Sequence, residues 1–178
     1  MKIVENHKPF ILIVEDEPVL RLTFEQFLKE EGYEVATAKN YNEALLQIEE
    51  NNPDIVVSDI ILGGKTGIDL LRKIDEQRLK IAVIMITGDP SIETAAESVR
   101  LGAFDYLSKP VTGPALKKVV RLALEQRQLA ADRDRYARRM DEYRRELDAI
   151  FNSVGSAIIT VDERLHVRHW NRAATEMF

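Results

Sequence analysis

The chain has 178 residues and a net charge of −5, with 45% hydrophobic and 31% charged residues, which is a globular rather than a disordered composition. The length suits one domain of ordinary size with an additional segment, and no apolar run approaches the roughly 18–20 residues of a membrane helix. There is no cysteine, which excludes disulfides and thiolate chemistry, and the first residues lack a signal peptide, so a reducing cytoplasm is expected.

Short apolar runs alternate with amphipathic segments as far as residue 113, and each run has the length and composition of a buried strand. The segments between them carry helical signals, such as Pro18 near the start of the first and Gly32 beyond its end. The fourth segment has an i, i+3, i+4, i+7 stripe from Ile92 to Val99. This alternation predicts βαβ units and a parallel sheet covered on both faces. The predicted strands are Phe10–Val14, Tyr33–Ala38, Ile55–Val57, Ile81–Ile86 and Phe104–Leu107.

From Ala115 to Ile150 the chain contains no Gly or Pro, which predicts one helix of about 54 Å. Apolar residues recur every seven positions, with a second row four residues later that is polar in its first half, and this pattern predicts a two-stranded coiled coil and a homodimer with looser pairing at the polar positions. A single helix lying on its own domain is the open alternative. The first row is Leu122, Leu129, Tyr136, Tyr143 and Ile150, and the second is Gln126, Arg133, Met140 and Leu147.

Residues 151–178 contain two more strand patterns, Ala157–Val161 and Leu165–Trp170, joined by turn residues at 162–164. Asn171 is expected to cap a helix that begins at Arg172. Because so short a segment cannot bury an independent core, we interpret it as the beginning of a second domain.

Charge differs between these regions. Residues 1–114 carry 12 Lys or Arg against 20 Asp or Glu, whereas residues 115–150 carry 10 against 7. An acidic first region is a poor candidate for direct nucleic-acid binding. The basic residues of the second region are interleaved with acidic ones at helical spacing, which favours a solvated helix face.

Polar residues stand at the carboxyl ends of four predicted strands. Glu15 and Asp16 follow the first strand, Asp59 the third, Thr87 the fourth and Lys109 the fifth. Carboxyl ends of parallel strands share one edge, where open α/β sheets bind ligands, so these residues are expected to converge. Each has an ordinary alternative as a turn or helix-start residue, and their conjunction is what favours a site.

Three carboxylates at one point repel one another by about 1–4 kcal/mol per pair, depending on the dielectric. Lys109 would offset one charge and a divalent cation the rest, with Mg²⁺ expected because it takes carboxylate oxygens and bridges to phosphate. A carboxylate can attack a phosphoryl group to form an acyl phosphate. Asp59 is the predicted nucleophile because it follows the central third strand and the glycine-rich loop 63–67 lets backbone approach an anion. Thr87 would donate its hydroxyl to a phosphoryl oxygen, and the metal and Lys109 would spread the charge of the transition state.

Four motifs, ILIVEDEP, VVSDIILGGKTG, VIMITG and FDYLSKP, together resemble the receiver domain of bacterial two-component response regulators, from about Pro9 to Leu124. The resemblance implies a (βα)5 doubly wound parallel sheet with strand order 2-1-3-4-5. It implies that Asp59 accepts a phosphoryl group from the phosphohistidine of a histidine kinase or phosphotransfer protein. The domain would catalyse only its own phosphorylation and dephosphorylation and would not be an enzyme in the usual sense.

The same resemblance assigns roles to individual residues. Thr87 and Tyr106 would form a switch pair, in which phosphorylation draws Thr87 inward and Tyr106 follows into the vacated space. Two departures from the family pattern are Glu at the first acidic position and ILGG where many members have Met-Pro after the phosphoacceptor. The implied Mg²⁺ ligands are Glu15, Asp16, Asp59 and the backbone carbonyl of Ile61.

The segment IFNSVGSAIITVDERLHVRHWNRAATEMF resembles the start of an α+β PAS domain. The expected organisation is a receiver domain at 1–124, an extended fifth helix and dimeric coiled-coil linker at 115–150, and a PAS-like fragment at 151–178. The switch would act through the coiled coil on the PAS domain and on a missing output module, a transcription regulator or a histidine kinase. Neither nucleic acid nor a membrane is an expected partner of this fragment.

Two alternatives remain open at this point. A Mg²⁺-dependent phosphatase of the haloacid-dehalogenase type uses a similar inventory, but its nucleophile follows the first strand in an Asp-x-Asp pattern, where this chain has Glu15-Asp16-Glu17. A degenerate receiver that serves only for dimerisation is the other, and the intact acidic residues argue against it.

Overall fold

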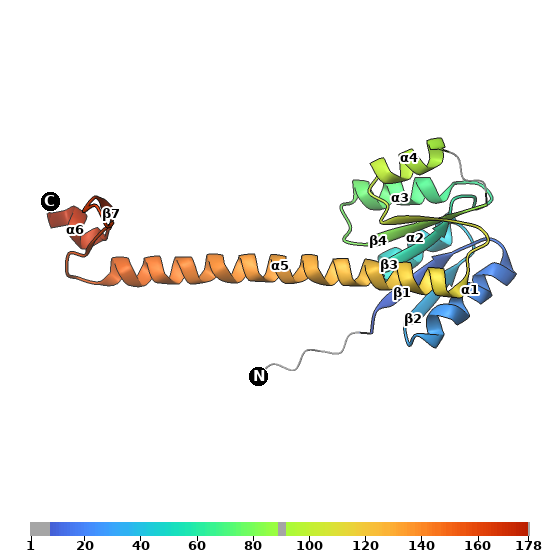
Figure 1. Ribbon diagram of the computed structural model, residues 1–178, viewed down its shortest axis with the longest axis horizontal. Helices are drawn as coiled ribbons and strands as arrows, with labels where there is room; N and C mark the ends of the chain where they lie inside the picture. The colour runs from blue at the N-terminus through green and yellow to red at the C-terminus, as the bar shows by residue number, and fades with distance from the viewer. Residues whose placement is uncertain (1–7, 89–91, 178) are drawn as a thin grey trace. The chain divides into compact units, whose positions relative to one another are not determined.

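The computed structural model describes residues 8–88 and 92–177, and it divides into two compact units, one up to residue 128 and one from residue 129 onward. The first unit is built on a parallel sheet in the order β2-β1-β3-β4-β5 (Figure 1), which confirms the predicted (βα)5 fold and strand order. Its strands are β1 (Phe10–Val14), β2 (Glu34–Ala38), β3 (Ile55–Asp59), β4 (Ala82–Thr87) and β5 (Asp105–Ser108). Its helices are α1 (Pro18–Glu30), α2 (Tyr41–Asn51), α3 (Gly67–Glu76), α4 (Ile92–Arg100) and α5 (Gly113–Ser153), the last of which continues into the second unit.

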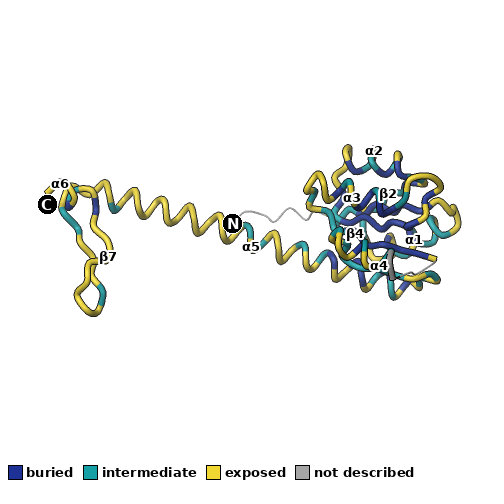
Figure 2. The backbone as a smooth tube through the Cα atoms, turned by 90° about the horizontal axis from the view of Figure 1, so that it is seen from above, coloured by how far each residue is buried: buried dark blue, intermediate teal, exposed yellow. Residues whose placement is uncertain are grey.

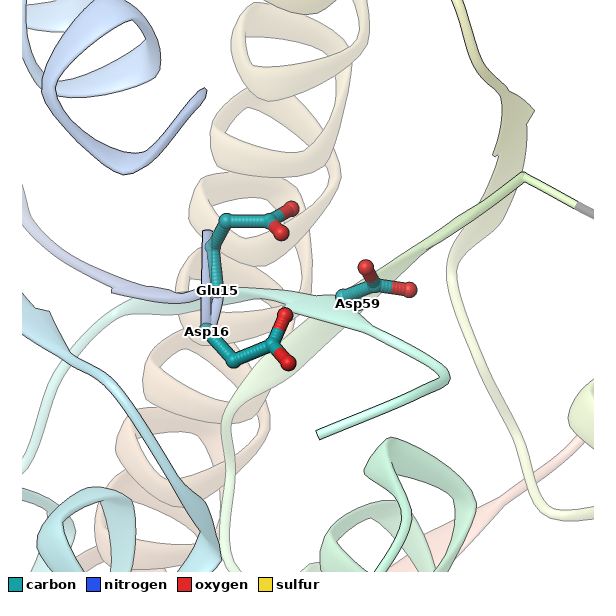
Figure 3. A group of neighbouring side chains, drawn as sticks. All are labelled: Glu15, Asp16 and Asp59. Atoms are coloured by element: carbon teal, nitrogen blue, oxygen red, sulfur yellow. The ribbon is translucent and has the colours of Figure 1, made fainter. Parts of the chain in front are cut away.

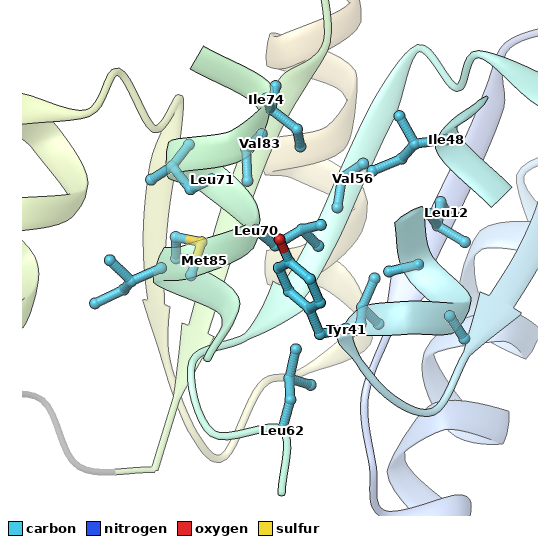
Figure 4. Close-up of a cluster of buried hydrophobic side chains, with 14 of the residues drawn as sticks. Leu12, Tyr41, Ile48, Val56, Leu62, Leu70, Leu71, Ile74, Val83 and Met85 are labelled. Atoms are coloured by element: carbon cyan, nitrogen blue, oxygen red, sulfur yellow. The ribbon is translucent and has the colours of Figure 1, made fainter. Parts of the chain in front are cut away.

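The strands of the sheet are buried (Figure 2). Their successive residues enter two different cores, one on each face of the sheet. Leu12 and Val14 of β1 pack with α2 and α3 in one core, part of which Figure 4 shows around Tyr41 and Met85. Ile11 and Ile13 pack on the other face with α1 and α5. The near-continuous apolar strands seen in the sequence therefore contribute side chains to both cores, and the polar side chains lie at the ends of the strands.

Several element boundaries differ from the prediction. β3 and β4 run on to include Asp59 and Thr87, because the ladder continues there and the Ile60 amide donates to the Ile86 carbonyl over 2.9 Å. The fifth helix begins at Gly113 rather than after Pro114, since a proline lacks only an N–H that the first helical turn does not use. The helix at 92–100 is confirmed. The last residue of its predicted apolar stripe, Val99, is 71% exposed and so does not face the core, and the side chain of the first, Ile92, lies outside those described.

Helix α5 changes character along its length. Its first turns bury Leu116, Val119, Val120 and Ala123 against the sheet and α1. The apolar residues of the predicted seam are exposed in this single chain. They are Leu122, Leu129, Tyr136, Met140, Tyr143, Leu147 and Ile150.

The second unit contains the end of α5, an antiparallel hairpin of β6 (Ile159–Val161) and β7 (Val167–Trp170), and α6 (Arg172–Met177). The predicted N-cap is confirmed, because the Asn171 side-chain oxygen accepts from the Ala174 amide over 3.0 Å. Asn171 is fully buried, and its side-chain amide also donates to the carbonyls of Phe151 and Val154. One asparagine thus ties the start of α6 to the last residues of α5 and the segment that follows.

Candidate functional site

Three carboxylates meet at the carboxyl edge of the sheet (Figure 3). Glu15 and Asp16 lie just after β1, and Asp59 is the last residue of the neighbouring strand β3. One oxygen from each side chain lies within 4.8 Å of the others. Glu15 and Asp59 are buried, whereas Asp16 is exposed, so the cluster opens to solvent on the Asp16 side.

Lys109 joins this cluster from the end of β5. Its ammonium lies 2.6 Å from Asp59 Oδ2 and 2.9 Å from Glu15 Oε2. Burial by itself would lower the pKa of Lys109, but hydrogen bonds to Asp59 and Glu15 outweigh it and raise that pKa. The ammonium therefore stays charged and offsets one of the three negative charges.

Glu15 has the features of a cation ligand. Burial raises its pKa, the hydrogen bond from Lys109 opposes that shift, and the negative charge of Asp59 raises it further. Its buried Oε2 atom lies near the Lys109 ammonium but accepts no hydrogen bond of good geometry. Hard divalent cations such as Mg²⁺ prefer an incompletely satisfied carboxylate oxygen among other carboxylates, so the donor set fits such an ion.

The Asp59 carboxylate is held at both oxygens. Oδ1 accepts from the Ile61 amide over 3.1 Å, and Oδ2 accepts from Lys109. The side chain of Ile61 is 60% exposed, so this residue contacts Asp59 through its amide. The two hydrogen bonds fix the plane of the buried carboxylate.

The loop that follows Asp59 is anchored where α3 begins. Thr66 and Asp69 form a capping box, in which the Thr66 hydroxyl accepts from the Asp69 amide and the Asp69 carboxylate accepts from the Thr66 amide. A Cβ atom on Gly67 would lie only 2.0 Å from the Asp59 carbonyl oxygen, so this position has room for glycine alone. The sequence suggested that Gly67 lets the backbone approach an anion. In the structure, Gly67 is needed because the backbone of Asp59 leaves no room for a side chain there.

Thr87 and Tyr106 lie on the adjacent strands β4 and β5. Thr87 is 1% exposed at the end of β4, and its carbonyl accepts from the Lys109 amide over 2.7 Å. The Tyr106 hydroxyl lies 3.3 Å from the Thr94 hydroxyl of α4. The structure thus brings Thr87 to the acidic edge beside Lys109 and places the Tyr106 hydroxyl against α4.

Sequence reasoning missed two of these neighbours. Arg21 of α1 donates to the backbone carbonyls of Glu15 and Asp16, over 2.7 and 3.2 Å. Its place five and six residues after the acidic pair is a signal for a contact back across the first helical turn. Thr94 carried no signal, because its contact depends on how α4 packs against β5.

No helix within residues 8–88 and 92–177 has both the length and the apolar character of a membrane span.

Comparisons with known proteins agree with this geometry. The family model for the response regulator receiver domain matches residues 11–121. The C4-dicarboxylate transport transcriptional regulatory protein DctD of Pseudomonas aeruginosa is 38% identical over 122 residues, which are 68% of this chain and 26% of that protein. The chain thus spans about a quarter of the length of this curated relative.

Two solved structures illustrate the extent of the similarity. A CheY-like response regulator receiver domain protein from Methanospirillum hungatei JF-1 has a TM-score of 0.67 at 32% identity, covering 70% of this chain and 99% of that one. NtrX from Brucella abortus has a TM-score of 0.70 at 31% identity, covering 85% of this chain and 36% of that one.

Proposed function

The chain belongs to the response regulator receiver domain family, the phosphoryl-accepting switch of two-component systems, and on that premise we propose that Asp59 is its phosphoacceptor. The observation that carries the assignment is the Lys109 ammonium, which lies within 3 Å of both Asp59 and Glu15 at the carboxyl edge of the sheet. Receiver domains interact with histidine kinases or phosphotransfer proteins, and we propose a cognate kinase of that kind as the donor.

The proposed reaction is one in-line transfer. An Asp59 carboxylate oxygen attacks the phosphorus of a phosphohistidine, an O–P bond forms, the N–P bond breaks, and the imidazole leaves with the bonding electrons. The protein contributes positioning and charge: Lys109 contacts a phosphoryl oxygen, and the buried Thr87 hydroxyl donates to another. Only the receiver's own phosphorylation and dephosphorylation are catalysed, so it is not an enzyme in the usual sense.

We propose Mg²⁺ as the cofactor of this site. Glu15, Asp16 and Asp59 would hold it with the backbone carbonyl of Ile61, and the unsatisfied Glu15 Oε2 is the atom that most favours a cation there. When bound, the ion neutralises charge that develops on the transferring phosphoryl group. The comparisons give no support to the haloacid-dehalogenase alternative, and Glu15-Asp16-Glu17 lacks its Asp-x-Asp nucleophile motif.

The assignment is tested by incubating the protein with acetyl phosphate or beryllofluoride and Mg²⁺, followed by intact-mass and fluorine NMR measurements. One adduct per chain is expected, abolished in Asp59→Asn and retained in Asp75→Asn, a matched change on the last turn of α3. An adduct that persists in Asp59→Asn, or none in the native chain, would refute the assignment.

We further propose that Thr87 and Tyr106 form the switch pair, with the Tyr106 hydroxyl leaving Thr94 when Thr87 moves inward. The exposed seam of α5 supports a homodimeric coiled coil as the route outward. Leu129→Asp should then give monomers in sedimentation equilibrium, while Ala131→Asp, on the roughly opposite side of the helix, should stay dimeric. A native chain that is monomeric at every concentration would exclude the dimer.

The proposed domain organisation is a receiver at 1–124, a linker helix at 115–150 and a PAS-like fragment at 151–178, with an output module outside this sequence. A transcription regulator or a histidine kinase would fit. The first is favoured because relatives such as DctD are named transcriptional regulatory proteins. A full-length sequence that ends in a kinase module would overturn that preference.

A further inference from the structure

The two acidic residues after β1 are consecutive, yet both face the same point. In a β-strand neighbouring side chains point to opposite faces of the sheet, so an extended chain could not direct both Glu15 and Asp16 toward Asp59. Figure 3 shows the Glu15 and Asp16 side chains extending to the side on which Asp59 lies, and one oxygen of each of the three carboxylates lies within 4.8 Å of the others. The Glu15 amide still donates to the Ala38 carbonyl of β2 over 3.1 Å, so the backbone leaves strand geometry beyond that bond, and the turn at residues 15 and 16 needs a further contact to hold it.

Arg21 holds this turn from the first turns of α1. Its Nη1 atom donates to the Glu15 carbonyl over 2.7 Å and to the Asp16 carbonyl over 3.2 Å. The two carbonyls lie beyond the last β1–β2 residue pair, at Val14, and among the described residues Arg21 is the donor to both. The Arg21 amide also donates to the Glu17 carbonyl over 3.0 Å, so the residue is fixed on its own helix.

We propose that Arg21 is a positioning residue for the cation site: by binding both carbonyls it orients the Glu15 and Asp16 carboxylates as a pair of ligands. This inference rests on the proposed function, because it concerns the site assigned above to Mg²⁺. Arg21 itself contacts backbone oxygens only and does not touch the reacting groups.

The sign of the effect separates positioning from simple electrostatics. A guanidinium near a cation site repels the cation, so if Arg21 acted through its charge alone, removing it would tighten Mg²⁺ binding. If Arg21 orients the ligands, removing it frees the turn and weakens binding. Changes to groups that orient metal ligands typically cost 10- to 100-fold in metal affinity.

The test is a calorimetric titration of Mg²⁺ into the native protein and into Arg21→Met, Arg21→Lys and Lys29→Met. Arg21→Met keeps an unbranched, flexible apolar stem but removes the charge and the donors, whereas Arg21→Lys keeps the charge and one donor group. Lys29→Met removes one positive charge from the exposed end of the same helix. Folding is checked by circular dichroism, and the beryllofluoride adduct is followed by fluorine NMR at rising Mg²⁺.

The expected dissociation constant for Mg²⁺ is about tenfold higher or more in Arg21→Met, intermediate in Arg21→Lys, and unchanged in Lys29→Met. The beryllofluoride adduct should return at correspondingly higher Mg²⁺. An unchanged or lower constant in a folded Arg21→Met, or in Arg21→Lys if Arg21→Met does not fold, overturns this inference alone. A native protein that neither binds Mg²⁺ nor forms the adduct overturns the proposed function with it.

Discussion

Lys109 Nζ lies 2.6 Å from Asp59 Oδ2, although 50 residues separate them along the chain. The same ammonium lies 2.9 Å from Glu15 Oε2, so one cation serves two buried carboxylates from two other strands. Because β5 is an edge strand and β1 and β3 are central, the contact ties the edge of the sheet to its centre. The residues of the site therefore also stabilise the packing of β5 against the centre of the sheet.

Removal of this ammonium should destabilise the cation-free protein. We expect Lys109→Met to lower the free energy of unfolding by about 1–3 kcal/mol, because the Glu15 and Asp59 carboxylates would remain buried without their positively charged partner. Millimolar Mg²⁺ should restore part of the loss by supplying the missing positive charge. Urea denaturation with and without Mg²⁺ measures both effects, and a loss no greater than that of Lys29→Met would contradict the prediction.

The capping box of α3 makes stability depend on pH. Hydrogen bonds from the Thr66 amide and hydroxyl hold the pKa of Asp69 below its usual 3.8. A lowered folded-state pKa gives stability that is present above 3.8 and lost as pH falls through the lower folded value. Asp69→Asn should therefore cost about 1 kcal/mol at neutral pH and progressively less below pH 3.8 in urea denaturation. Asp75→Asn on the same helix serves as the control, and equal losses at all pH values would refute this account.

Gly67 should tolerate no side chain. In Gly67→Ala the new Cβ would lie 2.0 Å from the Asp59 carbonyl oxygen and 2.7 Å from Ser58 Oγ, so the end of β3 must move. We expect a loss of about 3 kcal/mol or more in urea denaturation, together with slower labelling of Asp59 by acetyl phosphate. Gly155→Ala, where a Cβ meets nothing within 4 Å, should leave both unchanged. A fully stable Gly67→Ala protein would contradict the geometry.

The contacts that follow from the sheet topology could be predicted from the sequence, whereas those that depend on side-chain packing could not. Strand periodicity and the polar residues at strand ends placed Glu15, Asp59 and Lys109 together, because a parallel sheet aligns its carboxyl ends whatever the loops do. The spacing of Arg21 from Glu15 and Asp16 indicated only a contact across the first helical turn, and the pairing of Tyr106 with Thr94 was not predictable, since it depends on side-chain reach after packing. Where tertiary packing chooses the partner, a single sequence carries no period or spacing that reveals it.

One more contact that the sequence did not reveal links α5 to the amino edge of the sheet, opposite the candidate site. The Arg127 guanidinium lies 2.9 Å from Asp54 Oδ1 and donates to the Asp54 carbonyl over 2.8 Å and to the Lys80 carbonyl. The second Asp54 carboxylate oxygen accepts from the Phe10 amide over 2.9 Å, so the pair joins α5 to the starts of β1 and β3.

We expect Arg127→Met and Asp54→Asn each to lower the free energy of unfolding by about 1–3 kcal/mol, and a double-mutant cycle to give a coupling of about 1 kcal/mol or more. Arg121→Met should cost far less, because its Glu125 partner lies 4.0 Å away on an exposed surface. Hydrogen exchange should become faster in the turns of α5 around Arg127 in Arg127→Met, since the helix loses its hydrogen bonds to Asp54 there. Additive losses in the cycle, with unchanged exchange, would show that Arg127 and Asp54 act independently and that buried apolar side chains alone hold the helix.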